Sequence, residues 1–246
     1  MAENPEGEPV TEIRFQNHSD VELVQFTGSD EMVVQSARVS LTGGKSEQLK
    51  EATKTGMIRH MMDNRHGSVF EHNLFTFRVH TPIFVAREFM RHRMFSYNEL
   101  SGRYATAEPV FYVPDPFRKL RQQGKASAYD LVDGPRPQKD FEFVRDELKA
   151  GSSAAFEQYE AMLEASIARE VARMVLPVNL FTSFYATCNA RSMMSFLSLR
   201  VDSEQNSVET HPLAEIQEVA CLMEDWFEEK MPETHRAFYR NGRVAP

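Results

Sequence analysis

A two-residue alternation of apolar and polar side chains, the repeat of a half-buried strand, is clearest in residues 70–80. There aromatic residues alternate with Thr76 and Arg78, so we predict a strand. Residues 21–27 alternate less regularly but are rich in β-branched and aromatic side chains, which predicts a second strand. Residues 180–187 have the composition of a buried strand or of a tight helical segment, and the pattern does not separate the two.

Helical spacing, capping residues and breakers predict the helices. These cover residues 30–39 after Ser29, a stretch through Leu49 and Met62 after Ser46, 83–92 after Thr81 and Pro82, 141–176 as two helices broken near Gly151, 190–200 after Asn189, and 212–230. Residues 108–116 are predicted to be extended, and 117–137 to form a peripheral, partly helical insertion. Within the long helical stretch we expect a run of methionine, aromatic and aliphatic positions to be core, namely Phe156, Tyr159, Met162, Leu163, Ile167, Val171 and Met174.

The chain of 246 residues shows neither internal repeats nor a clean interdomain linker, so we predict one domain. Residues 1–11 are rich in Glu, Pro and Gly and are predicted to be a disordered tail. Residues 12–233 are predicted to form the domain, and 234–246 a short, basic, solvated tail.

Composition narrows the class of protein. Hydrophobic residues make up 41% and charged residues 26%, values typical of globular proteins. The net charge of −8 disfavours nucleic-acid binding, which needs a basic face. No signal peptide or membrane-spanning run is evident, and Cys188 and Cys221 have no disulfide or zinc spacing, so we expect a cytoplasmic protein without a metal site.

Residues 91–104 concentrate cationic and short polar side chains in this acidic chain. Fourteen residues hold three arginines, a histidine, two serines and an asparagine. A turn built from Ser101, Gly102 and Arg103 can bring backbone N–H groups and a guanidinium to one phosphate. We therefore predict a site for a small anionic ligand, most naturally a nucleotide.

The string RHRMFSYNELSGRY at 91–104 fits the pattern RHR-x-x-S-x-N-x-x-S-x-R-Y of the flavin-dependent thymidylate synthases, and the chain resembles this family over roughly residues 20–230. The resemblance implies an α/β fold with a central, largely antiparallel sheet surrounded by helices. It also implies methylation of dUMP to dTMP with 5,10-methylenetetrahydrofolate and with FADH2 regenerated by NADPH. A homotetramer whose active sites draw on several subunits is expected as well.

Matching the family residue by residue gives an expected dUMP site. Arg200 matches the arginine that activates the uracil ring, and a guanidinium, always charged and planar, suits that task. The other expected contacts with dUMP are Glu88, Arg91, Glu99, Leu100, Ser101, Gly102, Arg103 and Arg173. Glu88 departs from the glutamine common at its position.

The resemblance also implies an FAD site assembled from three stretches of the chain. The expected contacts are His66, Ser68, Glu71, Arg91, His92, Arg93, Glu99, Asn189, Ala190, Arg191 and Ser195. Ser195 stands where relatives carry a larger Asn or His. Arg191 falls in the first turn of its predicted helix, where the helix dipole disfavours a cation unless an anion is near.

Residue patterns alone leave other interpretations open. Arg169 and Arg173 at i,i+4 favour a solvated helix face, and Arg200 in a last helical turn is favourable for purely structural reasons. Cys188 lies just before a helix start, where the dipole can stabilise a thiolate. We expect Cys221 to be a buried hydrophobe and activation of the substrate to use charge rather than a cysteine nucleophile. A nucleotide-binding regulator without catalysis is one alternative function. An RNA-binding protein that uses the arginine-rich loop is the other, and the acidic net charge disfavours it.

Overall fold

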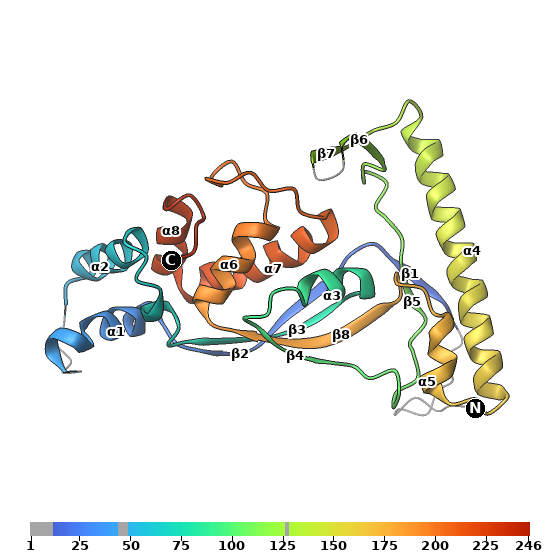
Figure 1. Ribbon diagram of the computed structural model, residues 1–246, viewed down its shortest axis with the longest axis horizontal. Coiled ribbons are helices and arrows are strands. Elements are labelled where there is room, and N and C mark those ends of the chain that lie inside the picture. The colour runs from blue at the N-terminus through green and yellow to red at the C-terminus, as the bar shows by residue number, and fades with distance from the viewer. Residues whose placement is uncertain (1–11, 44–48, 126–127) are drawn as a thin grey trace. The chain divides into compact units, whose positions relative to one another are not determined.

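The structure is a computed structural model that describes residues 12–43, 49–125 and 128–246 (Figure 1). The chain divides into two compact units, each assembled from separate stretches of sequence. Unit 1 holds the residues up to His18 together with His80–Arg87 and Glu99–Ser183. Unit 2 holds Ser19–Val79, Glu88–Asn98 and Phe184–Pro246.

The strands of the described residues form three sheets. They are β1 (Arg14–Gln16), β2 (Asp20–Thr27), β3 (Leu74–Pro82), β4 (Ser96–Glu99), β5 (Val110–Tyr112), β6 (Arg121–Lys125), β7 (Ala128–Val132) and β8 (Phe181–Cys188). The largest sheet has the order β2-β3-β8-β4, while β1 pairs in parallel with β5 and β6 pairs antiparallel with β7.

Side-chain pairs fix the direction of the two central strands. The hydroxyls of Thr76 and Thr187 lie 3.0 Å apart, and Nδ1 of His80 lies 2.9 Å from Oγ of Ser183. Four residues forward along β3 thus correspond to four residues backward along β8, which is the relation of antiparallel neighbours. The predicted α/β fold with a largely antiparallel sheet is confirmed.

Helices make up much of the rest of the chain. They are α1 (Asp30–Thr42), α2 (Glu51–Asp63), the 3-10 turn η1 (Gly67–Phe70), α3 (Ile83–Phe89), α4 (Pro137–Glu164), α5 (Arg169–Ala172), the 3-10 turn η2 (Arg173–Val175), α6 (Ala190–Arg200), α7 (Ala214–Lys230) and α8 (Pro232–Arg240). Ser29 caps α1 by accepting a hydrogen bond from the backbone of Met32, as its position predicts.

The core of unit 2 follows the alternation predicted for β3. Phe75 and Phe77 are fully buried, and the ring of Phe75 meets that of Phe227 from α7 edge-to-face at 5.9 Å. A second aromatic contact joins Phe89, at the end of α3, to Phe196 of α6 with ring centroids 4.6 Å apart. Burying each such ring stabilises the fold by about 1.5–3 kcal/mol, so α7 is held beside β3 and α6 beside the end of α3.

Unit 1 has its own core between β5 and α4. Phe111, Phe156, Tyr159, Ala172 and Leu180 form one buried cluster. The rings of Phe111 and Phe156 meet edge-to-face at 6.1 Å. This cluster fixes η2 and the start of β8 beside the long helix.

Several predicted boundaries are confirmed. The strands predicted at 21–27 and 70–80 are β2 and β3, although β3 starts at Leu74 because η1 precedes it. The segment 180–187 is a strand, β8. Helix α6 covers the predicted residues and is capped by Asn189.

Helix α3 is shorter than predicted, and its predicted N-cap is wrong. Thr81 is fully buried within β3, and the helix ends at Phe89 instead of continuing through 83–92. The hydroxyl of Tyr97 lies within hydrogen-bond distance of the carbonyls of Phe89 and His92, at 3.0 and 2.9 Å. These bonds, with a tighter turn from His92 N to Phe89 O of 3.0 Å, occupy acceptors that another α-helical turn would need.

The break predicted near Gly151 is wrong, because α4 is continuous from Pro137 to Glu164. Ser152 is buried, and its hydroxyl accepts a hydrogen bond of 3.0 Å from the amide of Asn179. A serine whose hydroxyl is satisfied by another segment need not interrupt its helix. The chain turns instead after Glu164, where Ser166 has a positive φ of 62°.

The predicted core run is confirmed only in part. Phe156 and Tyr159 are buried, and Met162 and Leu163 pack partly against their cluster. The expected core positions beyond the end of α4 are wrong, because they are exposed: Ile167, Val171 and Met174. The helical spacing that predicted them does not continue past Glu164.

The insertion at 117–137 is not partly helical as predicted but contains the β6–β7 hairpin. All of β6 is exposed, and its sequence RQQGK has no apolar side chain whose alternation would indicate a strand. Arg121 makes two hydrogen bonds of 2.7 Å to the carboxylate of Asp140 on α4, which anchors the hairpin. The hydrogen bond from Arg121 lowers the pKa of Asp140 below its usual value, although burial of the carboxylate acts in the opposite direction.

The C-terminal segment of the chain differs from prediction. The segment 234–246 is not a solvated tail, because α8 buries Phe238 and the side chain of Arg243 is only 3% exposed. Helix α2 begins at Glu51, and its predicted cap Ser46, like the tail 1–11, lies outside the described residues. Cys221 is exposed, which corrects the prediction that it is buried.

Candidate active site

The N-terminus of α6 is fixed by two asparagines. Asn189 caps the helix by accepting a hydrogen bond of 2.9 Å from the backbone of Ser192. Asn73, just before β3, accepts one of 2.6 Å from the backbone of Ala190. Both interactions satisfy N–H groups that a helix start leaves without partners. The predicted FAD residues Asn189 and Ala190 therefore sit on a rigid element.

Arg191 extends from this first turn toward η1, which lies between the predicted flavin residues His66 and Glu71. Its Nη1 donates to the carboxylate of Glu71 at 2.6 Å, which supplies the anion that the sequence argument required. A Cβ built on Gly67 would lie 2.5 Å from Cζ of Arg191, so the guanidinium rests on the glycine backbone. His66 and Ser68 flank this glycine and are exposed. The structure thus brings Arg191 together with Glu71 and with the turn that carries Ser68.

Arg200, at the other end of α6, is held by Glu88 from the last turn of α3 and by His92 from the turn after it. Its Nη1 donates to the carboxylate of Glu88, and its Nε donates to Nε2 of His92 at 3.0 Å. The side chain of Arg200 is 20% exposed and that of Glu88 28%, so the pair is partly shielded from water. Among the described residues, Nη2 of Arg200 makes no hydrogen bond and is available to a ligand.

The state of His92 follows from this arrangement. Burial, and then the charge of Arg200, lower its pKa to about 4, so the imidazole is neutral at neutral pH. Because Nε2 accepts from Arg200, the ring proton is assigned to Nδ1. His92 therefore orients the guanidinium without adding charge.

The turn that carries Arg91 and Arg93 presents both side chains at the surface. Within the described residues neither guanidinium forms an ion pair or a hydrogen bond, which distinguishes them from Arg191 and Arg200. The hydroxyl of Tyr97 stabilises this turn through the carbonyls of Phe89 and His92. Burial raises the pKa of this hydroxyl well above the usual value, so it remains a hydrogen-bond donor. Tyr97 lies at an unspecified position of the signature and was missed from sequence.

The predicted dUMP residues at 99–103 belong to unit 1. Glu99 accepts a hydrogen bond of 2.8 Å from the hydroxyl of Thr182 on β8. A Cβ on Gly102 would lie 3.2 Å from Cδ of Arg173, so that arginine packs along the loop. Arg103 forms an exposed ion pair of 3.1 Å with Glu170.

The remaining residues of this loop complete the cluster. The hydroxyl of Ser101 accepts from the backbone of Arg103 at 3.3 Å, and Leu100 is 53% exposed. Unit 1 therefore gathers the predicted dUMP residues from Glu99 to Arg103 and Arg173. Glu88, Arg91 and Arg200, expected with them, belong to unit 2.

The cysteines offer no activated nucleophile. Cys188 is 3% exposed, and burial raises the pKa of its thiol well above the usual value, which opposes thiolate formation at the start of α6. Burial, and then Glu224 and Asp225, also raise the pKa of Cys221. Ser195 is half-buried on α6. In the described part of the chain, no three His, Cys, Asp or Glu side chains gather where they could hold a metal ion.

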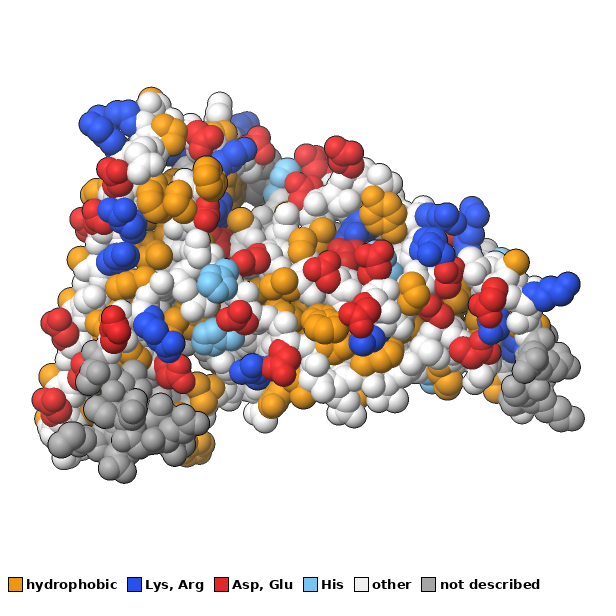
Figure 2. Space-filling model, turned by 180° about the vertical axis from the view of Figure 1, so that it is seen from behind, with side chains coloured by type: hydrophobic (Ala, Val, Ile, Leu, Met, Phe, Trp, Pro, Cys, Tyr) orange, Lys and Arg blue, Asp and Glu red, His pale blue; other side chains and the backbone are white. Residues whose placement is uncertain are grey.

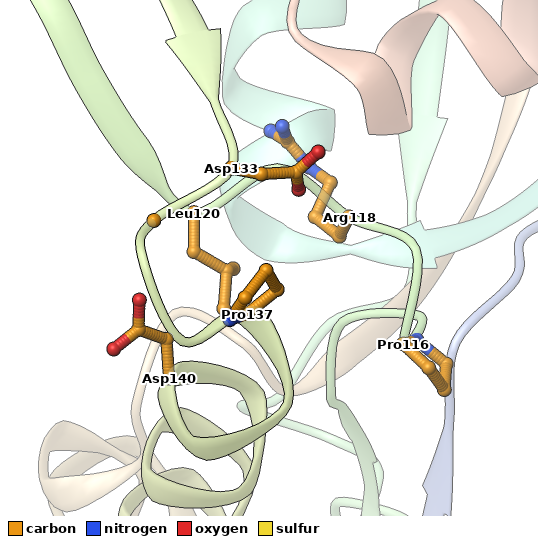
Figure 3. A pocket seen from close by; sticks show the side chains of 7 residues that line it. Pro116, Arg118, Leu120, Asp133, Pro137 and Asp140 are labelled. Carbon is orange, nitrogen blue, oxygen red and sulfur yellow. The ribbon is translucent and has the colours of Figure 1, made fainter.

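A hollow beside the β6–β7 hairpin lies apart from the predicted site residues (Figure 3). Its lining residues are Pro116, Arg118, Leu120, Asp133, Gly134, Pro137 and Asp140. Its empty space of about 220 Å³ includes open solvent, so even this upper value is below the roughly 300 Å³ at which ligand pockets begin. We assign it no ligand.

Comparison with known proteins decides the family. The family profile described as "Thymidylate synthase complementing protein" matches residues 22–233. The flavin-dependent thymidylate synthase of Streptomyces coelicolor is 48% identical across the whole of both chains. That of Tropheryma whipplei is 47% identical over 94% of this chain and 97% of its own. This chain belongs to the flavin-dependent thymidylate synthases.

Solved structures agree with the assignment to this family. The UMP/dUMP methylase PolB from Streptomyces cacaoi, bound with 5-Br dUMP, has a TM-score of 0.90 at 45% identity and covers 95% of this chain and 100% of its own. The structure bound with 5-Br UMP has a TM-score of 0.88. All the predicted site residues of this flavin-dependent thymidylate synthase fall inside residues 22–233, the range that the family profile matches. Arg243 and Pro246 lie beyond that range.

Proposed function

We propose that this chain catalyses the reductive methylation of dUMP to dTMP, with 5,10-methylenetetrahydrofolate as carbon donor and NADPH as reductant. The supporting observation is Arg200, whose guanidinium is fixed by Glu88 and by the neutral ring of His92. A family member that had become a mere nucleotide-binding regulator would have no need to orient this side chain. The assignment rests on that arrangement together with family membership.

The residues around α6 and the signature turn fit FAD. Arg91 and Arg93 are exposed, and no ion pair engages them within the described residues. Arg191 uses Nε and Nη1 within the protein, while its Nη2 has no described partner. Such donors suit the diphosphate of a dinucleotide. When bound, FAD reduced by NADPH supplies the hydride.

Arg200 stabilises negative charge on the uracil ring in this proposal. Methylation at C5 needs electron density at that carbon, and a charged donor aimed at the ring carbonyl lowers the barrier without a covalent step. The unengaged Nη2 of Arg200 is the atom available for this contact. The buried thiol of Cys188 is unsuited to attack C6, because burial opposes formation of its thiolate.

The unit 1 cluster is proposed to bind the nucleotide phosphate. Gly102 lets the Arg173 side chain pack along the loop, and Arg103 is exposed beside it. The guanidiniums of Arg103 and Arg173 and the hydroxyl of Ser101 can donate hydrogen bonds to phosphate oxygens. Each guanidinium offers paired donors in the geometry that a phosphate accepts.

A homotetramer with active sites shared between subunits is part of the proposal. Large apolar side chains reach the surface near several predicted site residues: Met94, Leu100, Tyr104, Met174 and Leu199. Figure 2 shows one face on which hydrophobic side chains emerge between charged ones. Exposed apolar surface of this kind is what a subunit interface would cover.

We further propose a cytoplasmic location. Within the described ranges, no helix has the length and apolar character needed to span a membrane.

The test is a flavin spectrum of the purified protein, followed under anaerobic conditions. We expect bound FAD that bleaches on addition of NADPH, and reoxidation coupled to dTMP formation when dUMP and 5,10-methylenetetrahydrofolate are added. Release of tritium from C5-labelled dUMP measures the chemistry directly.

The outcomes separate the enzyme from the regulator. A protein that binds dUMP but neither FAD nor NADPH would support the regulator. If NADPH reduced the flavin of a protein that also binds dUMP, but no dTMP formed, the proposed methylation would be refuted. The Cys188→Ser and Cys221→Ser double variant should keep its turnover, since neither thiol takes part.

A further inference from the structure

Arg191 is held by a part of the chain that lies beyond the matched family profile, which ends at residue 233. Besides its bond to Glu71, its Nε donates to the backbone carbonyl of Pro246 at 2.8 Å. The guanidinium is planar, so fixing both Nε and Nη1 also fixes the direction of Nη2. Pro246 itself is buried, which shows that the segment packs against the protein.

Local backbone contacts give the segment Asn241–Pro246 a defined path. Asn241 donates from its side chain to the carbonyl of Val244 at 3.0 Å. The carbonyl of Gly242 accepts from the backbone of Ser207 at 2.9 Å. Gly242 has a φ of 66°, which favours glycine, and Arg243 follows with a φ of 56°. The segment therefore makes a tight reversal after α8.

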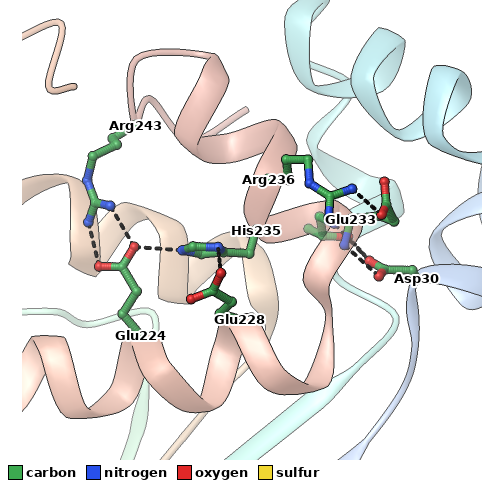
Figure 4. A network of polar contacts seen from close by, with 8 residues as sticks. Asp30, Glu224, Glu228, Glu233, His235, Arg236 and Arg243 are labelled. Atoms are coloured by element: carbon green, nitrogen blue, oxygen red, sulfur yellow. Dashed lines mark hydrogen bonds and ion pairs between the residues drawn. The ribbon is translucent and has the colours of Figure 1, made fainter.

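A buried ion pair anchors this reversal to α7 (Figure 4). Arg243 donates through Nη1 and Nη2 to the two oxygens of Glu224, at 2.6 and 2.8 Å. His235 lies 2.8 Å from the same carboxylate, and the Arg243 guanidinium stacks over Phe238 with 5.2 Å to the ring centroid. Burial alone would raise the pKa of Glu224, but hydrogen bonds from His235 and Arg243 hold it below the usual value. The anchor is thus ionised at neutral pH.

We propose that the segment Asn241–Pro246 is a positioning element for the flavin site: the Glu224–Arg243 pair fixes the segment so that the Pro246 carbonyl aims Arg191 at the cofactor. This inference rests on the proposed function. A glutamate alone leaves a guanidinium free to rotate about one hydrogen bond, whereas a second acceptor on Nε removes that freedom. In this role the segment lowers the cost of ordering Arg191 and needs no contact of its own with FAD.

The test deletes Ala245 and Pro246 from the full chain, which leaves Arg243 and its anchor in place. Dissociation constants for FAD are measured by flavin fluorescence quenching, and those for dUMP by calorimetry. We expect FAD to bind about tenfold more weakly, the loss typical of one hydrogen bond to a charged group, while the dUMP constant changes by less than about twofold.

A double-mutant cycle with Arg191→Lys separates positioning from general damage. The lysine side chain lacks the Nε–H group that Arg191 donates to Pro246. In the Arg191→Lys variant the deletion should therefore change FAD affinity by less than about twofold. Equal losses in the two backgrounds, or a parallel fall in dUMP affinity and melting temperature, would show that the segment acts only on stability. Arg243→Lys, which cannot span both oxygens of Glu224, should reproduce the deletion, whereas exposed Arg240→Lys should not.

A measurement without flavin keeps this inference separate from the proposed function. The rate at which phenylglyoxal modifies Arg191 in flavin-free protein, followed by mass spectrometry, should rise in the deletion variant because the side chain is released. An unchanged rate would reject the positioning role. If wild-type protein bound no FAD, the proposed function would fail, and the inference about the flavin site would fail with it. If wild type bound FAD and the deletion did not weaken it, only the inference would fail.

Discussion

Arg200 combines a permanent charge with a fixed direction, and the two can be separated by substitution. Arg200→Lys keeps the charge, but a single ammonium cannot reproduce the separate contacts that Nε and Nη1 make with His92 and Glu88. We expect thymidylate formation to fall by about 100-fold or more, a loss of roughly 3 kcal/mol in transition-state stabilisation, with FAD affinity unchanged. Steady-state kinetics and flavin titration measure the two effects.

A surface arginine provides the control for this substitution. Arg59 is exposed and, in the part of the chain that the structure describes, pairs only with Asp63 one turn away, so Arg59→Lys should leave both quantities at wild-type values. Arg200→Lys with near-normal turnover would mean that charge suffices and that the orientation by His92 is irrelevant.

His92 should make stability depend on acid pH. Its pKa is about 4 in the folded protein and 6.5 in the unfolded chain, so between these values the unfolded chain binds the proton that the folded one excludes. The stabilising contribution is complete above pH 6.5 and is lost as the pH falls toward 4. The slope is at most about 1.4 kcal/mol per pH unit, and solvent access reduces it.

Urea denaturation at pH 7 and pH 5 measures this contribution. His92→Gln should show a smaller loss of unfolding free energy between the two pH values than wild type. The same substitution at exposed His72 serves as the control. An identical pH dependence in wild type and His92→Gln would show that His92 titrates normally.

At the scale of elements, the contact between η1 and α6 depends on a glycine. A methyl group at position 67 would lie 2.5 Å from the Arg191 guanidinium carbon, so Gly67→Ala must displace that side chain or the turn. We expect FAD to bind at least about tenfold more weakly, with a loss of stability of about 1–3 kcal/mol from overpacking. Flavin titration and thermal unfolding measure the two consequences.

Gly56 is the matched position for this test. It lies within α2, and a Cβ built there meets nothing within 4 Å. Gly56→Ala should therefore stabilise the protein by up to about 1 kcal/mol, because alanine is the better helix former, and leave FAD binding alone. If Gly67→Ala bound FAD like wild type, Arg191 would not need its place over η1.

At the scale of the whole molecule, sharing of active sites between subunits can be tested by mixing. Arg200 lies in unit 2 and Arg173 in unit 1, so variants lacking either one carry separate defects. If one active site takes these residues from different chains, co-refolded Arg200→Ala and Arg173→Ala chains should regain up to about a quarter of wild-type activity. Size-exclusion chromatography with light scattering measures the assembly itself.

The control is each variant refolded alone, which should stay inactive. A mixture that forms tetramers but recovers no activity would place both residues of a site in one chain. A monomeric protein with full activity would contradict the shared site altogether.

The sequence by itself determined the features that depend on neighbouring residues. Alternation around Phe75 and Phe77 marked β3, and Asn189 marked the start of α6, because side-chain direction and capping follow directly from local backbone geometry. The signature at 91–104 indicated the family, which the comparisons confirm. The dUMP and flavin roles of individual side chains remain predictions.

Tertiary structure decided what depends on segments far apart in the chain. Asn179 satisfies Ser152 and keeps α4 intact, while Tyr97 takes the acceptors that would have extended α3. No local pattern shows that a carbonyl at Pro246 meets Arg191, 55 residues away. Such contacts obey no periodicity, since they arise only when folding brings two surfaces together and leaves each buried polar group needing a partner.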